Sequence, residues 1–138
     1  MIRIVVDGAP VAKGRGRVGR MGNGAVRVFT PSATRRYEDV IRAVAAGEMN
    51  GRPPLDEALA LTVTSYVPIP RSWSLKKQTA ARDGLIRPTV KPDWDNVGKI
   101  TDALKTIVWR DDALVVDAHV HKHYSDRPRL EIVVEPIG

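Results

Sequence analysis

The chain is organised around residues 91–112, which read KPDWDNVGKITDALKTIVWRDD. Apolar residues in this stretch recur at spacings of three and four, the period of one face of an α-helix. They are Val97, Ile100, Leu104 and Ile107. The pattern predicts a helix from about residue 95 to residue 107 that buries this stripe in the core.

The same helix carries ionisable side chains on another face. Asp95, Lys99 and Asp102 lie four and three residues apart, about half a turn from the apolar stripe. The helix is therefore expected to present an acid, a base and an acid away from the core. Two alternatives stay open, because Asp95 could be only a helix N-cap, or only an i, i+4 partner of Lys99.

Further carboxylates flank the predicted helix. A lysine–proline pair favours an extended backbone just before it, so Asp93 and Asp95 would point to the same side if the extension continues that far. Trp94, between them, would then point into the protein. Asp111 and Asp112 follow the helix, and one of these carboxylates could join the first two if the chain folds back. The alternative is that this acidic pair is a solvated turn.

Converging carboxylates would repel one another, and a bound divalent cation would remove that penalty. Hard oxygen ligands select Mg²⁺ or Mn²⁺ rather than zinc. The chain has no cysteine, which excludes a thiolate zinc site. The stretch therefore favours a metal-dependent phosphodiester hydrolase.

The pattern K-P-D-W-D-N…K…D-A-L…W-R-D-D-A-L-V-V resembles the RusA family of Holliday junction resolvases, which are small DNA endonucleases of bacteria and their phages. The likeness extends to PVAKGRGRV near the start, to VFTP before a helix, and to HVHKHYSDRPRLEIVV at the end. The resemblance thus covers nearly the whole chain.

The resemblance implies a set of catalytic residues, which are Asp93, Asp95, Lys99 and Asp112. It implies that the three aspartates hold Mg²⁺, with Mn²⁺ as an alternative, and that a homodimer presents two such sites to branched DNA. This chain has one residue fewer than family members between the lysine and the Asp-Ala-Leu segment, so Asp102 receives no catalytic role. Ala12 and Gly16 stand where proline is common in the family.

The remaining pattern predicts one α+β domain with a mixed sheet of about five strands and about three helices. The expected strands are residues 3–6, 25–29, 59–67, 114–124 and 129–135, and the other helices are residues 32–48 and 72–83. The strand at 25–29 could return beside the first, and the last strand is expected to pair with its predecessor. A length of 138 residues suits a single domain spanning 1–138.

Basic residues indicate an anionic partner. The formal net charge is +6, and the basic residues concentrate away from the acidic centre. Those predicted to contact DNA are Lys13, Arg15, Arg17, Arg20 and Arg27 in and after a glycine-rich loop at residues 8–24, and Lys76 and Lys77 on a helix. The alternative is that both segments are simply solvated.

Three histidines alternate along the strand predicted at residues 114–124. His119, His121 and His123 would project from one face, where they are more often an exposed row than a metal site and could instead contact phosphate.

No apolar run reaches the length of a membrane helix and the first residues lack a signal-peptide pattern, so a cytoplasmic protein without a membrane partner is expected. Two other functions stay open: a non-catalytic nucleic-acid binder, and a metal-dependent nuclease for other branched or duplex DNA.

Overall fold

The computed structural model describes residues 1–11, 17–20, 26–29 and 32–138, with the backbone alone described for 17–20 and 26–29. Its elements are β1 (Ile2–Asp7), β2 (Arg17–Arg20), β3 (Val26–Phe29), α1 (Ser32–Met49), β4 (Leu59–Pro68), α2 (Leu75–Arg82), α3 (Trp94–Lys99), the 3₁₀ helices η1 (Ile100–Leu104) and η2 (Asp112–Leu114), β5 (Val115–Ser125) and β6 (Arg129–Pro136). Within these residues, no helix has the length and apolar character needed to cross a membrane. The predicted α+β class is confirmed.

The main sheet has four strands in the order β1-β6-β4-β5, one fewer than expected. β4 is antiparallel to β6 and parallel to β5. The prediction that the last strand pairs with its predecessor is wrong, because β4 lies between β5 and β6. The strand order places β4 between β6 and β5 and leaves β5 as an edge. Side chains of β4 alternate between buried and half-buried positions, so both faces of this strand are largely covered.

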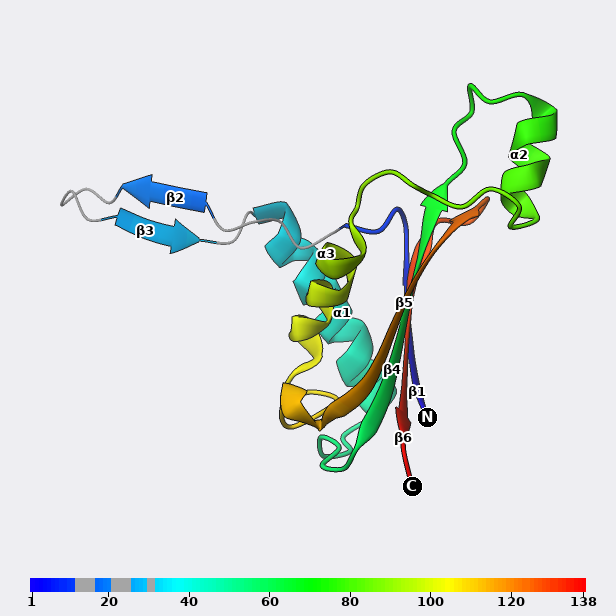
Figure 1. The fold of residues 1–138 in the computed structure, drawn as a ribbon. Helices are drawn as coiled ribbons and strands as arrows, with labels where there is room; N and C mark the ends of the chain where they lie inside the picture. The colour runs from blue at the N-terminus through cyan, green and yellow to red at the C-terminus, as the bar shows by residue number, and fades with distance from the viewer. Residues whose placement is uncertain (12–16, 21–25, 30–31) are drawn as a thin grey trace.

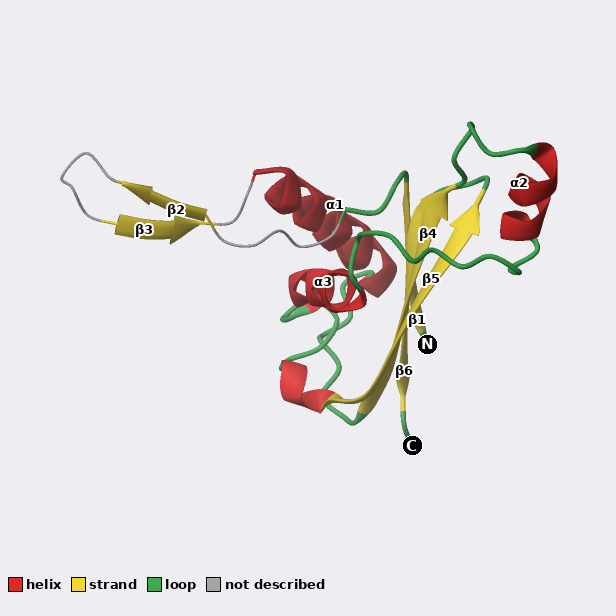
Figure 2. Cartoon of the chain, turned by 45° about the horizontal axis from the view of Figure 1, so that its top comes forward, coloured by secondary structure: helices red, strands yellow, loops and turns green. Residues whose placement is uncertain are grey.

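α1 and α3 cover one face of the sheet (Figure 1), where α1 packs on β1 and α3 lies against β4 and β5. α2 lies on the other side and contacts β5. The apolar stripe of residues 91–112 is confirmed, because Val97, Ile100 and Leu104 are buried in the same core as Leu59 and Val63 of β4. Figure 2 shows α1 and α3 side by side on this face.

The central helix is shorter than its apolar pattern predicts. It is α-helical only through Lys99 and continues as a 3₁₀ helix to Leu104. Beyond it, the backbone of residues 108–110 hydrogen-bonds to Leu55, with N–O distances of 2.8 and 3.1 Å. These extended contacts bury Val108 and Trp109 against the core, and the helix therefore ends before them.

The first half of the chain departs from prediction in two places. The predicted loop at residues 8–24 contains strand β2, and β3 pairs with β2 rather than with the first strand. A hairpin closed within the segment needs only local pairing, which costs less loop entropy than reaching β1. The spacing of Tyr37, Val40, Ile41, Val44 and Ala45 predicts a buried stripe on the helix at residues 32–48. In α1, however, Val40 is 48% exposed, whereas Glu38 is buried and pairs with Arg42 at 3.3 Å.

α2 lies within the bounds of the helix predicted at residues 72–83. Ser74 is its N-cap and accepts a hydrogen bond from the Lys77 backbone N–H at 3.2 Å. Gly84 follows the C-cap with a φ of 80°, the left-handed conformation that glycine adopts without strain.

Candidate active site

The side chains of residues 93–95 are not arranged as an extended backbone through Asp93 and Asp95 would predict. The N-cap of α3 is Asp93, and its side chain makes no capping hydrogen bond. Asp95 already lies in the first helical turn, so the extension that would align both aspartates does not reach it. The N-cap interpretation of Asp95 is also wrong. Trp94 is 68% exposed, which contradicts the prediction that it points into the protein.

The acid–base–acid face of α3 and η1 borders a hollow beside the edge strand β5. Asp95, Lys99 and Asp102 all line it, as their helical spacing predicts, and its volume is about 350 Å³. His119 of β5 lines the opposite wall, and Val63 and Val120 contribute to an apolar lining. The hollow therefore combines charged groups at its rim with a mostly apolar interior.

Lys99 and Asp95 form the ion pair that their i, i+4 spacing allows. The Lys99 Nζ lies 3.8 Å from Asp95 Oδ2, and the two side chains are 60% and 48% exposed. An exposed pair at this distance contributes only about 0.2–1 kcal/mol to stability. Both groups therefore remain available to a ligand that enters the hollow.

Asp112 lies elsewhere, at the start of η2, just before β5. Its Oδ1 accepts a hydrogen bond of 2.8 Å from the indole N–H of Trp109, whose side chain is 1% exposed. Asp111 caps η2 by accepting from the Ala113 backbone N–H at 3.0 Å. Both aspartates are exposed, so the acidic pair is a solvated turn whose side chains are held by these two hydrogen bonds.

The predicted convergence of one member of the acidic pair with Asp93 and Asp95 is not observed. In Figure 1 the orange segment at the start of β5 lies below α3, on the side of the C-terminal end of that helix. The reason is that residues 94–104 form a continuous helical rod, which spans about 19 Å at the usual rises per residue. The two acidic segments therefore sit towards opposite ends of that rod.

These positions decide how well the residues fit a metal ion. The carboxylate oxygens are of the kind that Mg²⁺ and Mn²⁺ prefer. In the described parts of the chain, however, no three histidine or acidic side chains are placed to hold one ion together. The three aspartates as placed here do not form a complete metal site.

The residues predicted to bind DNA are only partly described. Lys13 and Arg15 lie outside the described residues, and Arg17, Arg20 and Arg27 fall on β2 and β3, where only the backbone is described. On α2, Lys76 is exposed, and Lys77 places its Nζ 4.1 Å from the centre of the Trp73 ring.

The histidine row forms a stack rather than a metal site. The rings of His121 and His123 lie 6.3 Å apart, and His123 also stacks on Tyr66 at 5.8 Å. Burial, with further contributions from Arg87 and His121, lowers the pKa of His123. Arg87 contacts the His123 Nε2 at 3.2 Å. A neutral His123 ring beside the Arg87 guanidinium is therefore favoured here.

Sequence reasoning did not place His119 in the same hollow as Asp95. The alternation on β5 predicted only a common histidine face, whereas His119 alone of the three lines the hollow. The position of α3 over the edge of β5 brings the two together, and nothing in the local sequence of either element indicates this pairing. Asp102, to which the family resemblance assigns no catalytic role, also lines this hollow.

Comparison with known proteins supplies an independent line of argument. The family model described as "Endodeoxyribonuclease RusA" matches residues 7–135. The chain is also 37% identical over 140 residues to a protein of Bacillus subtilis (strain 168) that is named "Uncharacterized protein YqaN". That match covers 99% of this chain and 97% of the relative.

Proposed function

Because this chain is a member of the RusA family of endodeoxyribonucleases, we propose that it resolves Holliday junctions by paired symmetrical nicks during DNA recombination and repair. The observation that supports a hydrolytic site is the hollow between α3 and β5. There a lysine and two carboxylates share one face of a helix, beside an exposed edge strand.

Hydrolysis joins a water oxygen to phosphorus and breaks the bond from phosphorus to one bridging oxygen. The transition state carries extra negative charge on the phosphoryl oxygens, so a fixed cation nearby lowers its energy. Lys99 is the cation of the hollow, and we assign it this role. Asp93, Asp95 and Asp112 are proposed as the catalytic carboxylates, and of these three Asp95 lines the hollow.

We further propose that cleavage requires Mg²⁺ or Mn²⁺, because hard carboxylate oxygens favour these ions. The three aspartates are not grouped in this structure. The requirement is tested directly, by removing divalent ions with EDTA and restoring Mg²⁺, Mn²⁺ or Zn²⁺ one at a time.

One assay separates this function from its alternatives. A labelled four-way junction, a linear duplex of the same sequence and a single strand are incubated with the protein, with and without Mg²⁺. Paired nicks in the junction alone, dependent on Mg²⁺, support the proposal. Equal cutting of the linear duplex would indicate a less selective nuclease, and tight binding without cutting would indicate a non-catalytic DNA binder.

Single substitutions test whether cleavage depends on residues of the hollow. Asp95→Asn should abolish cleavage while junction binding is retained, because it removes one charge and little volume. The matched control is Asp39→Asn on α1, where the side chain is 73% exposed and pairs with Arg42. Nicking by Asp95→Asn at the wild-type rate would remove Asp95 from the proposed site.

Paired cuts require two sites, and we propose that a homodimer supplies them with the two-fold symmetry of the junction. We expect the protein to act in the cytoplasm. Sedimentation equilibrium with and without junction DNA measures the number of subunits, and a monomer in both states would contradict the dimer.

A further inference from the structure

We propose that a second, apolar pocket directly upstream of Asp93 binds one unstacked nucleobase of branched DNA and so selects which phosphodiester lies over the hollow. This inference rests on the proposed function, because it names how that site chooses its substrate. The pocket has a volume of about 480 Å³, and its lining includes Lys91 and Pro92, the two residues that precede Asp93.

One end of the pocket is an aromatic wall. Trp73 meets Tyr124 of β5 edge to face, with ring centres 5.2 Å apart and planes at 70°. Val67 and Tyr124 are each only 9% exposed, and both pack with Ala81 of α2 in a small separate core. The wall is therefore held by the sheet and by α2, and it does not depend on a ligand for its shape.

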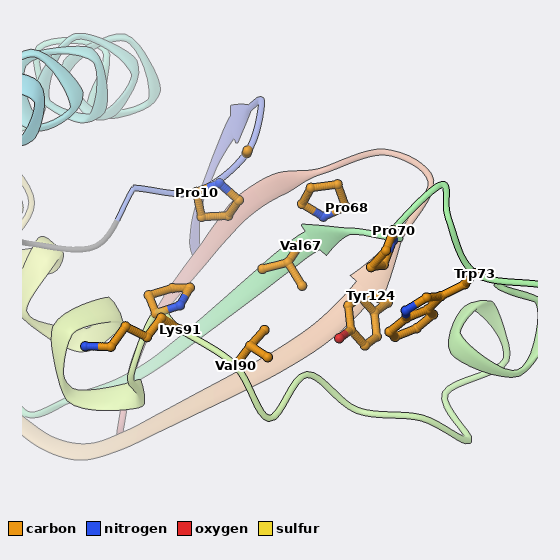
Figure 3. Close-up of a pocket in the computed structure, with 10 residues that line it drawn as sticks. Pro10, Val67, Pro68, Pro70, Trp73, Val90, Lys91 and Tyr124 are labelled. Atoms are coloured by element: carbon orange, nitrogen blue, oxygen red, sulfur yellow. The ribbon is translucent and has the colours of Figure 1, made fainter. Parts of the chain in front are cut away.

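The other end of the pocket is formed by two loops, as Figure 3 shows. Pro10 follows β1, and Lys91 extends away from Trp73 on the opposite side. Val90, between these ends, is 60% exposed, and its carbonyl accepts a hydrogen bond of 2.7 Å from Lys122 Nζ. This bond fastens the loop to β5, so the pocket has two fixed sides and an open mouth.

The position of the pocket connects it to the proposed chemistry. Consecutive Cα atoms are about 3.8 Å apart, so Asp93 follows Pro92 at that distance and Asp95 lies at most about 11 Å from it. The pocket wall and the hollow are thus joined by three residues of chain. A base held in the first would keep its neighbouring phosphates close to the second.

The charge around the pocket matches nucleic acid. Lys77 lies over the Trp73 ring, and Lys91 lines the pocket itself. Neither lysine forms an ion pair within the described part of the chain. An apolar slot with an aromatic wall and lysines beside it suits a flat base with anionic phosphates on either side. An uncharged apolar ligand would leave both lysines unused.

The pocket also provides a reason for selecting branched DNA. Unstacking a base costs least where it is mismatched, damaged or already single-stranded. The base pairs at a branch point lose part of the continuous stacking of a duplex, so we expect them to unstack at a lower cost as well. A pocket that requires an unstacked base therefore favours branched DNA over a perfect duplex. The loss of one stacking contact between a base and an aromatic side chain lowers affinity by about 5- to 150-fold.

The test removes single bases from the DNA. Four-way junctions that each carry one abasic site, moved stepwise through the branch point, are titrated with the intact protein in EDTA, and the Kd is measured by fluorescence anisotropy. We expect a loss of about 5- to 150-fold at one or two positions and little change elsewhere. A flat profile for the wild-type protein overturns the inference.

A pocket-filling variant locates the effect. Val90→Trp should occupy the pocket, since Val90 lines it and is exposed, and the hydrogen bond from Lys122 uses only its backbone. The Kd of this variant for the intact junction should equal the Kd of the wild type for the junction with the sensitive abasic site. The abasic site should cause no further loss of affinity in the variant. Leu85→Trp is the control, because Leu85 is 79% exposed in the same loop and does not line the pocket.

Failure of the inference and failure of the proposed function give different results. A wild-type protein that nicks junctions with Mg²⁺ but has a flat abasic profile refutes only the pocket. A protein that nicks no DNA but loses affinity at single abasic positions refutes the nuclease and retains the pocket. If Val90→Trp keeps the position-specific loss of the wild type, the base binds elsewhere and the inference is overturned.

Discussion

The hydrogen bond from Trp109 to Asp112 allows a test of whether Asp112 serves folding, cleavage or both. Trp109 is 1% exposed, and its indole N–H donates to Asp112 Oδ1 at 2.8 Å. Asp112→Ala leaves this N–H buried without its partner, which should lower the free energy of unfolding by about 1–3 kcal/mol. Asp112→Asn keeps an oxygen acceptor and loses only the charge, so it should cost about 1 kcal/mol or less.

The two substitutions should differ in stability but not in activity. If the carboxylate is catalytic, both variants should lose about 100-fold or more in the rate of junction cleavage, the usual effect of removing one group that acts in the transition state. Stability is measured by urea unfolding followed through the intrinsic fluorescence of the three tryptophans, and cleavage by single-turnover nicking with Mg²⁺. Asp111→Asn is the matched control, because it removes the adjacent charge and keeps a capping acceptor for the Ala113 N–H.

Two outcomes would refute this reasoning. Full cleavage by a folded Asp112→Asn would show that Asp112 serves only as the acceptor for Trp109. Equal stability of Asp112→Ala and the wild type would show that the buried indole N–H finds another partner, and the stabilising role of the bond would be wrong.

Three further predictions concern stability. Ser65 is 0% exposed, and its hydroxyl has no hydrogen-bond partner among the described residues. Ser65→Ala should therefore raise the free energy of unfolding, measured by urea titration, by about 1 kcal/mol. A clear decrease in that free energy would show that the hydroxyl has a partner. Leu104→Ala should lower the same quantity by about 2–5 kcal/mol, since the side chain is 0% exposed in the core, and a loss below about 1 kcal/mol would contradict that packing. Burial, Arg87 and His121 lower the pKa of His123, so the unfolded chain binds more protons than the folded chain below about pH 6.5. The free energy of unfolding should therefore fall as the pH drops through that value, and His123→Gln should reduce the fall. An NMR titration that gives His123 a pKa above 6.5 would refute this prediction.

Local pattern predicted most of the secondary structure of this protein. The alternation along β4, the Ser74 cap of α2 and the stripe through Val97, Ile100 and Leu104 each depend on residues that are close in sequence. The spacing of Asp95, Lys99 and Asp102 likewise determined that they share one face of a helix. These features follow from periods of two and 3.6 residues, which the sequence alone specifies.

Only the tertiary structure decided which segments meet. The insertion of β6 between β1 and β4, the placement of His119 opposite Asp95, and the pocket between Trp73 and Lys91 all join residues far apart in the chain. Strand order and side-chain contact across elements depend on how whole surfaces pack, and a local pattern of residues is compatible with several such arrangements. The sequence likewise identified the carboxylates of Asp93, Asp95 and Asp112. Their separation in space, with Asp112 far from the other two, is set by the helical rod of residues 94–104.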